Sequence, residues 1–453
     1  VFSDNGLETW YVDFANNEIN QTTNGGSNFI LDMMSVSQAR IYIDAINFNW
    51  AYPLAGSLND TYGTSGQALH DGGSDLIFSQ FVQDSAGDTI AVGSKVNGSD
   101  KGIYITKYNL AGNLDSSFGA SGIRYFDEVG THIATDVAID HNGKIVVTAI
   151  SDNIAKILRF NPDGSPDLSF DSDGNMSIDL GGISTNLESV LIDENNNIIV
   201  GGTYEATSGN TEFLIGRYLD SGAPDLSFGG DGNVTIDVGS SQSAFIHKIA
   251  FHGTDKILAV GHNSSGFAVA SVFNDGTQDF SNEQAIATSA IANDVIVQDD
   301  GKFVVIGENA STNSIIMARF TDTGELDTTF ASSGILNENP NPLSSMTLAQ
   351  TAISLDDGSF FVAGESDSKF LLAKYTKDGA LSLDFNTTGF TEIDLSPIDP
   401  ETVMDMELLA NGNLFLGGVG LDTTLKFVFA QINQHSLAAP EKGKLYAYVN
   451  DNV

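Results

Sequence analysis

The chain has 453 residues and a hydrophobic content of 41%, which suits a globular protein with room for more than one domain. Its 59 acidic and 19 basic residues give a formal charge of -40, which disfavours nucleic acid and anionic membranes as partners. Such a charge is compatible with binding of cations, above all calcium, and it also keeps a secreted protein in solution, which is the simpler interpretation. Because it contains no cysteine, disulfides, thiolate catalysis and Cys-ligated zinc are excluded.

Residues 1–56 differ from everything that follows them. Residues 39–50 alternate apolar and polar side chains, as a half-buried strand does, and residues 20–27 are a polar loop. Both tryptophans, Trp10 and Trp50, lie in this part of the chain. We expect a small β-rich N-terminal extension.

A hairpin turn recurs through residues 57–434. A short strand precedes each turn and a β-branched strand follows it, as in residues 136–140 and 144–147. Asn-Gly and Asp-Gly are common at these turns, because they tolerate the positive φ that tight hairpins need. The turns are centred on Gly87, Gly143, Asn196, Asp255, Gly301, Gly358 and Gly412.

A second pattern follows each pair of strands. A third strand ends in a basic residue and an aromatic one; a Gly turn, Leu-Asp-x-x-Phe and a second Gly come next. A close variant joins Arg159-Phe160 to Gly164, Asp167, Phe170 and Gly174. A fourth strand then begins, as at residues 176–179. Each unit therefore has four strands, and there are seven units.

These units predict an all-β fold, a seven-bladed β-propeller of four-stranded antiparallel blades. Strands that are apolar on both faces need cover on both sides, which neighbouring blades supply. The first copy of the pattern, at residues 58–66, has no complete unit before it, and the last unit ends after its third strand. We expect the strand at residues 67–70 to complete the seventh blade and close the ring.

The recurring pattern resembles the delta-60 repeat family, and the resemblance spans residues 57–434. It implies the propeller-like fold and a bacterial surface or secreted setting, without one established activity. Blade four departs from the pattern, since Val272 replaces the basic residue and Gln278-Asp279-Phe280 replaces the longer acidic element.

The basic and acidic positions of the pattern are expected to form structural ion pairs that clamp the third strand to the following loop. A sugar- or anion-binding role for the arginines is the alternative, but a packing device recurs in most blades more readily than a ligand site does. The expected pairs are Lys107 with Asp115, Arg159 with Asp167, Arg217 with Asp225, and Arg319 with Asp327. The corresponding partner of Lys374 is Ser382, that of Gln431 is Asn59, and Asp279 fills the acidic position of blade four.

Seven polar residues are predicted to begin the innermost strands and to ring a water-filled central channel: Gln80, Asp136, Ser189, Lys248, Asp294, Thr351 and Asp405. Asp136, Asp294 and Asp405 are candidate ligands for a hard cation such as calcium. A solvated channel without a metal is the alternative.

Residues 435–453 read as a linker followed by a strand at 444–449. No nucleophile elbow or phosphate loop occurs, and no apolar run is long enough to span a bilayer as a helix. We therefore expect a non-catalytic extracellular propeller at the bacterial cell surface, either an adhesin or a structural subunit of an assembly or filament. Its termini would mediate self-association or contacts with surface proteins or glycans. The alternatives are a metal-dependent lactonase-, lyase- or glycosidase-like enzyme with a site in the channel, and a glycan-binding module.

Overall fold

The computed structural model describes residues 2–4, 8–13, 18–21, 55–126, 130–238, 243–284, 286, 289–395 and 401–433. The chain divides into two compact units, Val1–Ala51 and Tyr52–Val453. In the first unit, β1 (Phe2–Asp4), β2 (Glu8–Asp13) and β3 (Glu18–Gln21) form an antiparallel sheet in the order β1-β2-β3. The strands expected at 39–50 and 444–449 lie outside the described residues.

The second unit contains seven four-stranded antiparallel sheets, which we number as blades 1 to 7. Blade 1 is β5 (Leu76–Gln83), β6 (Thr89–Asn97), β7 (Asp100–Tyr108) and β8 (Ile123–Phe126); blade 2 is β9 (His132–Ile139), β10 (Ile145–Ser151), β11 (Ile154–Phe160) and β12 (Asn175–Ile178). Blade 3 is β13 (Ser184–Ile192), β14 (Ile198–Thr207), β15 (Asn210–Tyr218) and β16 (Asn233–Ile236); blade 4 is β17 (Phe245–His252), β18 (Lys256–Asn263), β19 (Gly266–Phe273) and β20 (Gln278–Gln284).

The other three blades repeat this order. Blade 5 is β21 (Ala290–Val297), β22 (Phe303–Asn309), β23 (Ser314–Phe320) and β24 (Ile335–Glu338), with the short 3-10 helix η1 (Phe330–Ser332) before its last strand. Blade 6 is β25 (Thr347–Ser354), β26 (Phe360–Ser366), β27 (Lys369–Tyr375) and β28 (Phe390–Ile393). Blade 7 is β29 (Glu401–Leu408), β30 (Leu414–Leu421), β31 (Leu425–Ile432) and β4 (Gln67–His70).

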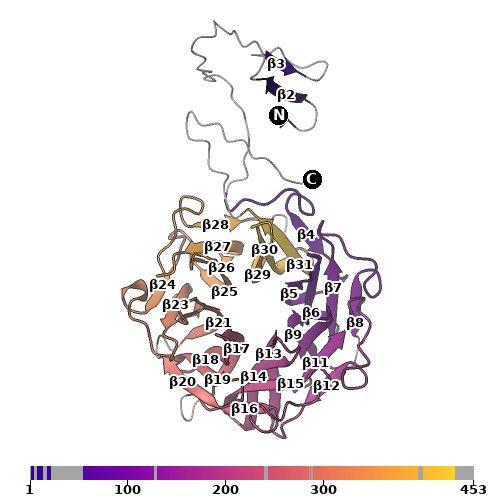
Figure 1. Cartoon of the computed structure of the whole chain (residues 1–453), viewed down its shortest axis with the longest axis vertical. Coiled ribbons are helices and arrows are strands. Elements are labelled where there is room, and N and C mark those ends of the chain that lie inside the picture. The colour runs from indigo at the N-terminus through magenta and orange to yellow at the C-terminus, as the bar shows by residue number, and fades with distance from the viewer. Residues whose placement is uncertain are drawn as a thin grey trace. The chain divides into compact units, whose positions relative to one another are not determined.

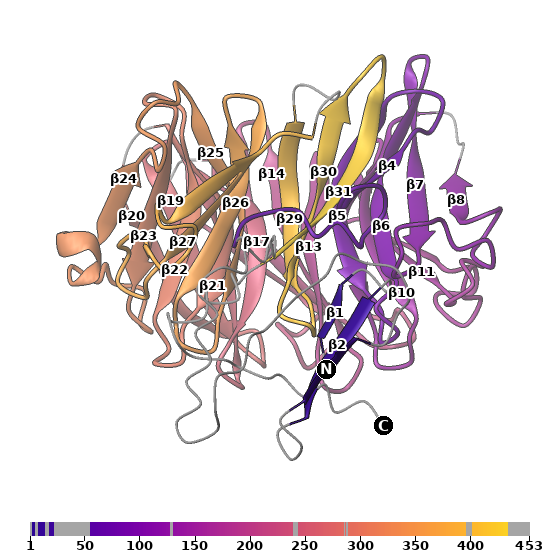
Figure 2. The same ribbon diagram turned by 90° about the horizontal axis from the view of Figure 1, so that it is seen from above.

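The blades form a closed circle, with the first strand of each blade nearest the axis (Figure 1). Figure 2 shows the same strands from the side, running along the depth of the ring. The circle closes where β4 pairs antiparallel with β31, placing His70 opposite Phe427 and Gln67 opposite Ala430. The predicted seven-bladed propeller and its closure by an N-terminal strand are confirmed.

Apolar side chains on both faces of each blade explain why the ring forms. The middle strands are almost continuously buried, as in the four residues Phe303–Ile306 of β22. The described residues contain seven hydrophobic clusters, one between each pair of neighbouring blades. The cluster that joins blades 7 and 1 packs Phe78 and Phe81 against Phe415, Phe427 and Phe429. No single blade therefore has a core of its own.

Among the described residues, no helix has the length and apolar character needed to cross a membrane.

Candidate functional site at the propeller centre

Each innermost strand carries a β-bulge at the same height. The register of β9 against β10 shifts so that Thr135 has no partner, and Asp136 is the next paired residue. The other six inner strands shift in the same way. The residues that follow the seven bulges are the seven predicted from the sequence, and we call them the axial ring: Gln80, Asp136, Ser189, Lys248, Asp294, Thr351 and Asp405. The prediction that they begin the inner strands is wrong: each strand starts earlier, at His132 in β9 for example, because the chain pairs on both sides of the bulge.

Three aspartates of the axial ring fasten one blade to the next. Asp136 Oδ2 in blade 2 accepts a hydrogen bond from the backbone N–H of Val190 in blade 3, at 2.9 Å. Asp294 Oδ2 accepts from Ala352 of blade 6 at 2.8 Å and from the Thr351 hydroxyl at 3.1 Å.

The third aspartate, Asp405 in blade 7, accepts from the backbone N–H of Phe81 in blade 1 at 3.0 Å. The Gln80 amide, oriented with its nitrogen toward the same carboxylate, donates to Oδ2 at 2.6 Å. In each of the three aspartates the other carboxylate oxygen accepts from the N–H of the next residue in its own strand. These carboxylates therefore act as staples between blades.

Lys248 brings a positive charge to the axial ring. Its Nζ lies 3.6 Å from Asp136 Oδ2, and its side chain is 27% exposed. Burial alone would lower the pKa of Lys248, but the charges of Asp136, Asp294 and Asp405 together raise it above its ordinary value. Lys248 therefore stays protonated and neutralises part of the surrounding negative charge.

Several carboxyl groups around the axial ring hold their protons unusually tightly. Burial raises the pKa of Asp405 to about 7, although Lys248 acts against the shift. Burial and the charge of Asp136 raise the pKa of Glu188, the unpaired residue of the β13 bulge, to about 7. Burial and the charge of Asp405 likewise raise the pKa of Glu407 to about 7. Three carboxyl groups at the centre of the propeller thus have pKa values near neutral pH.

The three candidate metal ligands lie in the same ring, one each in blades 2, 5 and 7. Their carboxylates accept hydrogen bonds from backbone N–H groups, and they interact electrostatically with the positive charge of Lys248. Within the described ranges there is no group of three or more His, Cys, Asp or Glu side chains that could hold a metal ion.

The recurring basic residues form a second set of bridges, on the loops that follow the third strand of a blade. Arg159 Nε lies 2.8 Å from Asp167 Oδ2, and its guanidinium also pairs with Asp220 in the next blade. The same geometry recurs with Arg217 Nε 2.7 Å from Asp225, and with Arg319 Nε 2.9 Å from Asp327. Arg319 NH1 also donates to the backbone carbonyl of Lys377 in the following blade, at 2.8 Å.

The lysine copies of this bridge pair differently. Lys107 Nζ is 3.9 Å from Asp115 but only 2.8 Å from Asp84, in the hairpin turn of its own blade. Lys374 Nζ lies 2.8 Å from Asp384, so the expected partner, Ser382, is displaced by an aspartate two residues further along. A lysine lacks the forked guanidinium that spans two loops at once.

In blade 4 and at the closure the pairs also change. Asp279 forms an ion pair with Lys256, whose Nζ lies 2.8 Å from Asp279 Oδ2, because Val272 occupies the usual basic position. At the closure, Asn59 donates its side-chain N–H to Gln431.

The phenylalanine of the pattern packs on the glycine turn of the next blade. Gly164 has φ +79°, and a Cβ there would lie 2.8 Å from the Phe118 ring of blade 1. Gly222 and Gly379 have positive φ as well and meet the rings of Phe170 and Phe330. The glycine is required both for its backbone conformation and for the space that the ring occupies.

A family model described as "Domain of unknown function (DUF5122) beta-propeller" matches residues 142–170, 194–228 and 298–330. The three matched segments end at Phe170, Phe228 and Phe330, the inter-blade phenylalanines of blades 2, 3 and 5. The chain is a β-propeller repeat protein. No protein in a search of curated sequences matches it.

Solved structures similar to this propeller repeat protein include a catalytically inactive virginiamycin B lyase from Staphylococcus aureus with quinupristin. The TM-score is 0.50 at 12% identity, over 80% of this chain and 98% of that one. A streptogramin B lyase structure gives a TM-score of 0.50 at 12% identity, over 80% of this chain and 96% of that one. At this identity the likeness shows the fold alone.

Sequence reasoning missed part of the centre. The sequence marks Lys248 as polar, but its role as the cation among three aspartates depends on the ring being closed. Glu188 immediately precedes an axial-ring residue in the sequence, so the bulge position was a usable signal. Glu407 lies two residues beyond Asp405, which is the spacing of side chains on one face of a strand.

Proposed function

We propose that this propeller is a non-catalytic extracellular protein at the bacterial surface, serving as an adhesin or as a structural subunit of a surface assembly. We further propose that its repeats are of the delta-60 type. A structural role is supported by the contacts that the recurring charged side chains make between blades. The axial aspartates and the loop arginines each bridge one blade to the next, which stiffens the ring.

The first unit supports the assembly version of the proposal. Among the described strands, β1 and β3 each pair with β2 alone and form the edges of its sheet. Addition of a strand to such an edge is a common way to join subunits. We infer that the chain self-associates through this sheet, or that it contacts other surface proteins or glycans there.

Light scattering coupled to size-exclusion chromatography tests the assembly version. The full chain is run from low to high micromolar concentration, with and without calcium. We expect the mass to rise with concentration beyond that of one chain. A single-chain mass under every condition contradicts the assembly version and leaves only adhesion to foreign surfaces, which binding of the labelled protein to intact bacterial cells then measures.

The carboxyl groups with a pKa near 7 support a second candidate, an enzyme with its site at the propeller centre. Glu188 and Glu407 could remove a proton from a substrate at neutral pH. This candidate predicts that Glu188→Gln or Glu407→Gln abolishes an activity found by screening lactones and polysaccharides. If such an activity persists in both variants, the centre is not its site.

A further inference from the structure

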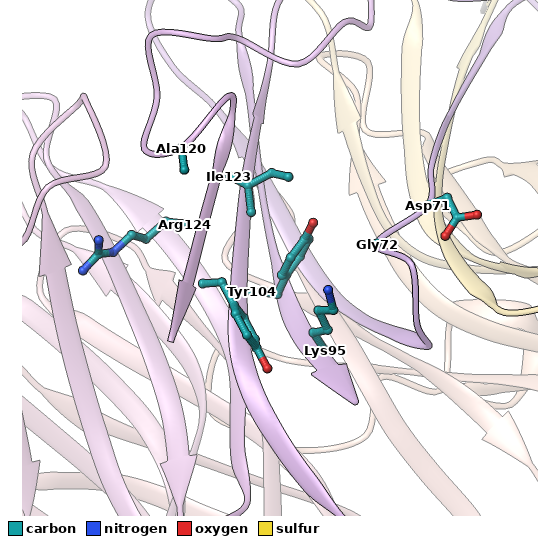
Figure 3. A pocket seen from close by; sticks show the side chains of 8 residues that line it. Asp71, Gly72, Lys95, Tyr104, Ala120, Ile123 and Arg124 are labelled. Atoms are coloured by element: carbon teal, nitrogen blue, oxygen red, sulfur yellow. The ribbon is translucent and has the colours of Figure 1, made fainter. Parts of the chain in front are cut away.

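A groove at the closing seam of the ring contains a group of side chains found in blade 1 alone. It has a volume of about 420 Å³, within the size range of small-ligand pockets. Lys95 of β6, Tyr104 of β7 and Tyr125 of β8 line it, and Asp71 and Gly72, which follow β4 of blade 7, form its rim (Figure 3). We call it the seam groove.

The strand register shows that the other blades do not repeat this group. Tyr104 and Tyr125 are direct cross-strand partners, and Lys95 lies two positions along β6 from Gly93, the partner of Tyr104. The pairs equivalent to Tyr104 and Tyr125 in blades 2 to 7 are Lys156/Ser177, Leu214/Thr235, Ala268/Glu283, Ile316/Asn337, Leu371/Glu392 and Val428/Leu69. The equivalents of Lys95 are Ser151, Tyr204, Asn263, Asn309, Ser366 and Gly420. A feature present in one blade of seven is not needed to build a blade.

The charge of Lys95 is not matched by a carboxylate. Its Nζ lies 5.9 Å from the centre of the Tyr104 ring and 5.6 Å from that of Tyr125. Within the part of the chain that the structure describes, it makes no hydrogen bond and no ion pair. The Arg124 side chain is directed away from it (Figure 3). An ammonium group held only against ring faces keeps its capacity to bind an anion.

The two tyrosines play different parts. Tyr104 is buried, and its hydroxyl is 2.8 Å from His70 Nε2, so its ring is a fixed wall. Tyr125 is half-buried and its ring lies over Gly102, where a Cβ would come within 2.7 Å of it. The glycine therefore makes room for the aromatic ring beside the groove.

We propose that the seam groove binds a sugar residue carrying one acidic group, as found in uronic-acid and sulfated polysaccharides. Lys95 pairs with the carboxylate or sulfate, while the exposed part of Tyr125 packs on the apolar face of the sugar ring. The carboxylate of Asp71 at the rim and the overall charge of -40 disfavour a multiply charged phosphate.

Isothermal titration of the full chain tests this with three probes: trigalacturonic acid for the carboxylate, a κ-carrageenan tetrasaccharide for the sulfate, and maltotriose as the neutral sugar. We expect one or both acidic sugars to bind and maltotriose to bind at least about tenfold more weakly. Lys95→Met should weaken acidic-sugar binding about tenfold or more, and Tyr125→Ala should also weaken it. Lys156→Met, which removes a lysine from blade 2, is the matched control and should bind as the parent does.

Absence of heat with both acidic sugars at about 10 mM overturns the proposal, as does equal loss of binding in the Lys95 and Lys156 variants. Equal affinity for maltotriose also overturns it, because the charge would then have no role. Thermal unfolding of each variant shows whether it is folded, and Tyr125→Phe replaces Tyr125→Ala if the smaller side chain prevents folding. The seam groove does not depend on the proposed surface role. Light scattering tests self-assembly and isothermal titration tests sugar binding, so one proposal can be contradicted while the other stands.

Discussion

Replacing Lys248 by Met should destabilise the propeller in a pH-dependent way. The substitution removes the positive charge that Asp136, Asp294 and Asp405 share, while keeping much of the side-chain volume. Removing one partner of a buried ion pair costs about 3–5 kcal/mol; because the Lys248 side chain is 27% exposed, solvent screening reduces the expected loss to roughly 2–3 kcal/mol. With about 2.1 cal/mol/K of unfolding entropy per residue, a propeller of roughly 380 residues should lose about 3 °C in Tm.

The sign of the pH dependence follows from the raised pKa values. Asp405, Glu188 and Glu407 have a pKa of about 7 in the folded chain, above the ordinary carboxyl values. Protonation of these groups therefore stabilises the fold fully below their ordinary pKa, and that stabilisation is lost as pH rises through 7. Lys248 lowers the pKa of Asp405 and of Asp294, so without it these two pKa values rise further, and the variant should lose most at pH 8 and much less at pH 5.5.

Differential scanning fluorimetry at both pH values measures the effect, with Lys156→Met as the control. Lys156 has no ion pair within the described residues, so its replacement should change Tm little at either pH. An equal loss of Tm at pH 5.5 and pH 8 in the Lys248 variant would show that packing, and not charge, is its contribution.

Three further predictions concern the loops between blades. Arg159→Met removes the guanidinium from Asp167 and Asp140, while Lys144 keeps its ion pair with Asp167 at 2.7 Å, so urea unfolding should show a loss of roughly 2–3 kcal/mol, less than for a charge left unpaired; a loss below about 1 kcal/mol contradicts the bridge. Gly164→Ala should lower Tm more than Gly181→Ala, because both glycines have positive φ but only at Gly164 would a Cβ meet an aromatic ring; equal effects leave backbone strain as the whole cost. Hydrogen bonds and the neighbouring guanidinium outweigh burial and lower the pKa of Asp167 and Asp327, so their stabilisation is present above the ordinary aspartate pKa and lost as pH falls below it. Tm should therefore fall between pH 4 and pH 2, and a constant Tm over that range contradicts this assignment.

The blade count and the closure could be predicted because each depends on a short local signal that recurs. Asn-Gly and Asp-Gly turns mark hairpins whatever lies around them, and the incomplete units at the two ends of the repeat could pair only with each other. The loop pairs of Arg159, Arg217 and Arg319 were accessible for the same reason, since both partners lie within one pattern. The blades could thus be predicted because the same turns and loop ion pairs recur in most units of the sequence.

What could not be predicted depends on residues brought together across the ring. Lys248 and Asp136 lie in blades 4 and 2, and nothing in their local sequence relates them. Each inner strand pairs on both sides of its bulge, so it begins well before the axial residue where the sequence places its start, as β9 does at His132. Lys374 pairs with Asp384 and not with Ser382, because a flexible lysine side chain can reach a nearby carboxylate. The fixed spacing of the repeat pattern does not reveal this partner.

Positive charge is scarce in this chain, and its placement is therefore informative. Most basic side chains in the described ranges form ion pairs with carboxylates, and the buried ones bridge neighbouring blades or loops. Lys95 and Lys156 are exceptions within the described ranges. At Lys95, two aromatic rings from adjacent strands face the ammonium instead of a carboxylate. Two of the blades that lack these rings have a hydrogen bond there: Asn263 donates to Glu283 at 2.9 Å in blade 4, and Ser366 donates to Glu392 at 2.6 Å in blade 6. Blade 1 instead has a cation without a carboxylate partner at this position, and a group that the other blades do not repeat has the form expected of a binding site and not of a structural repeat.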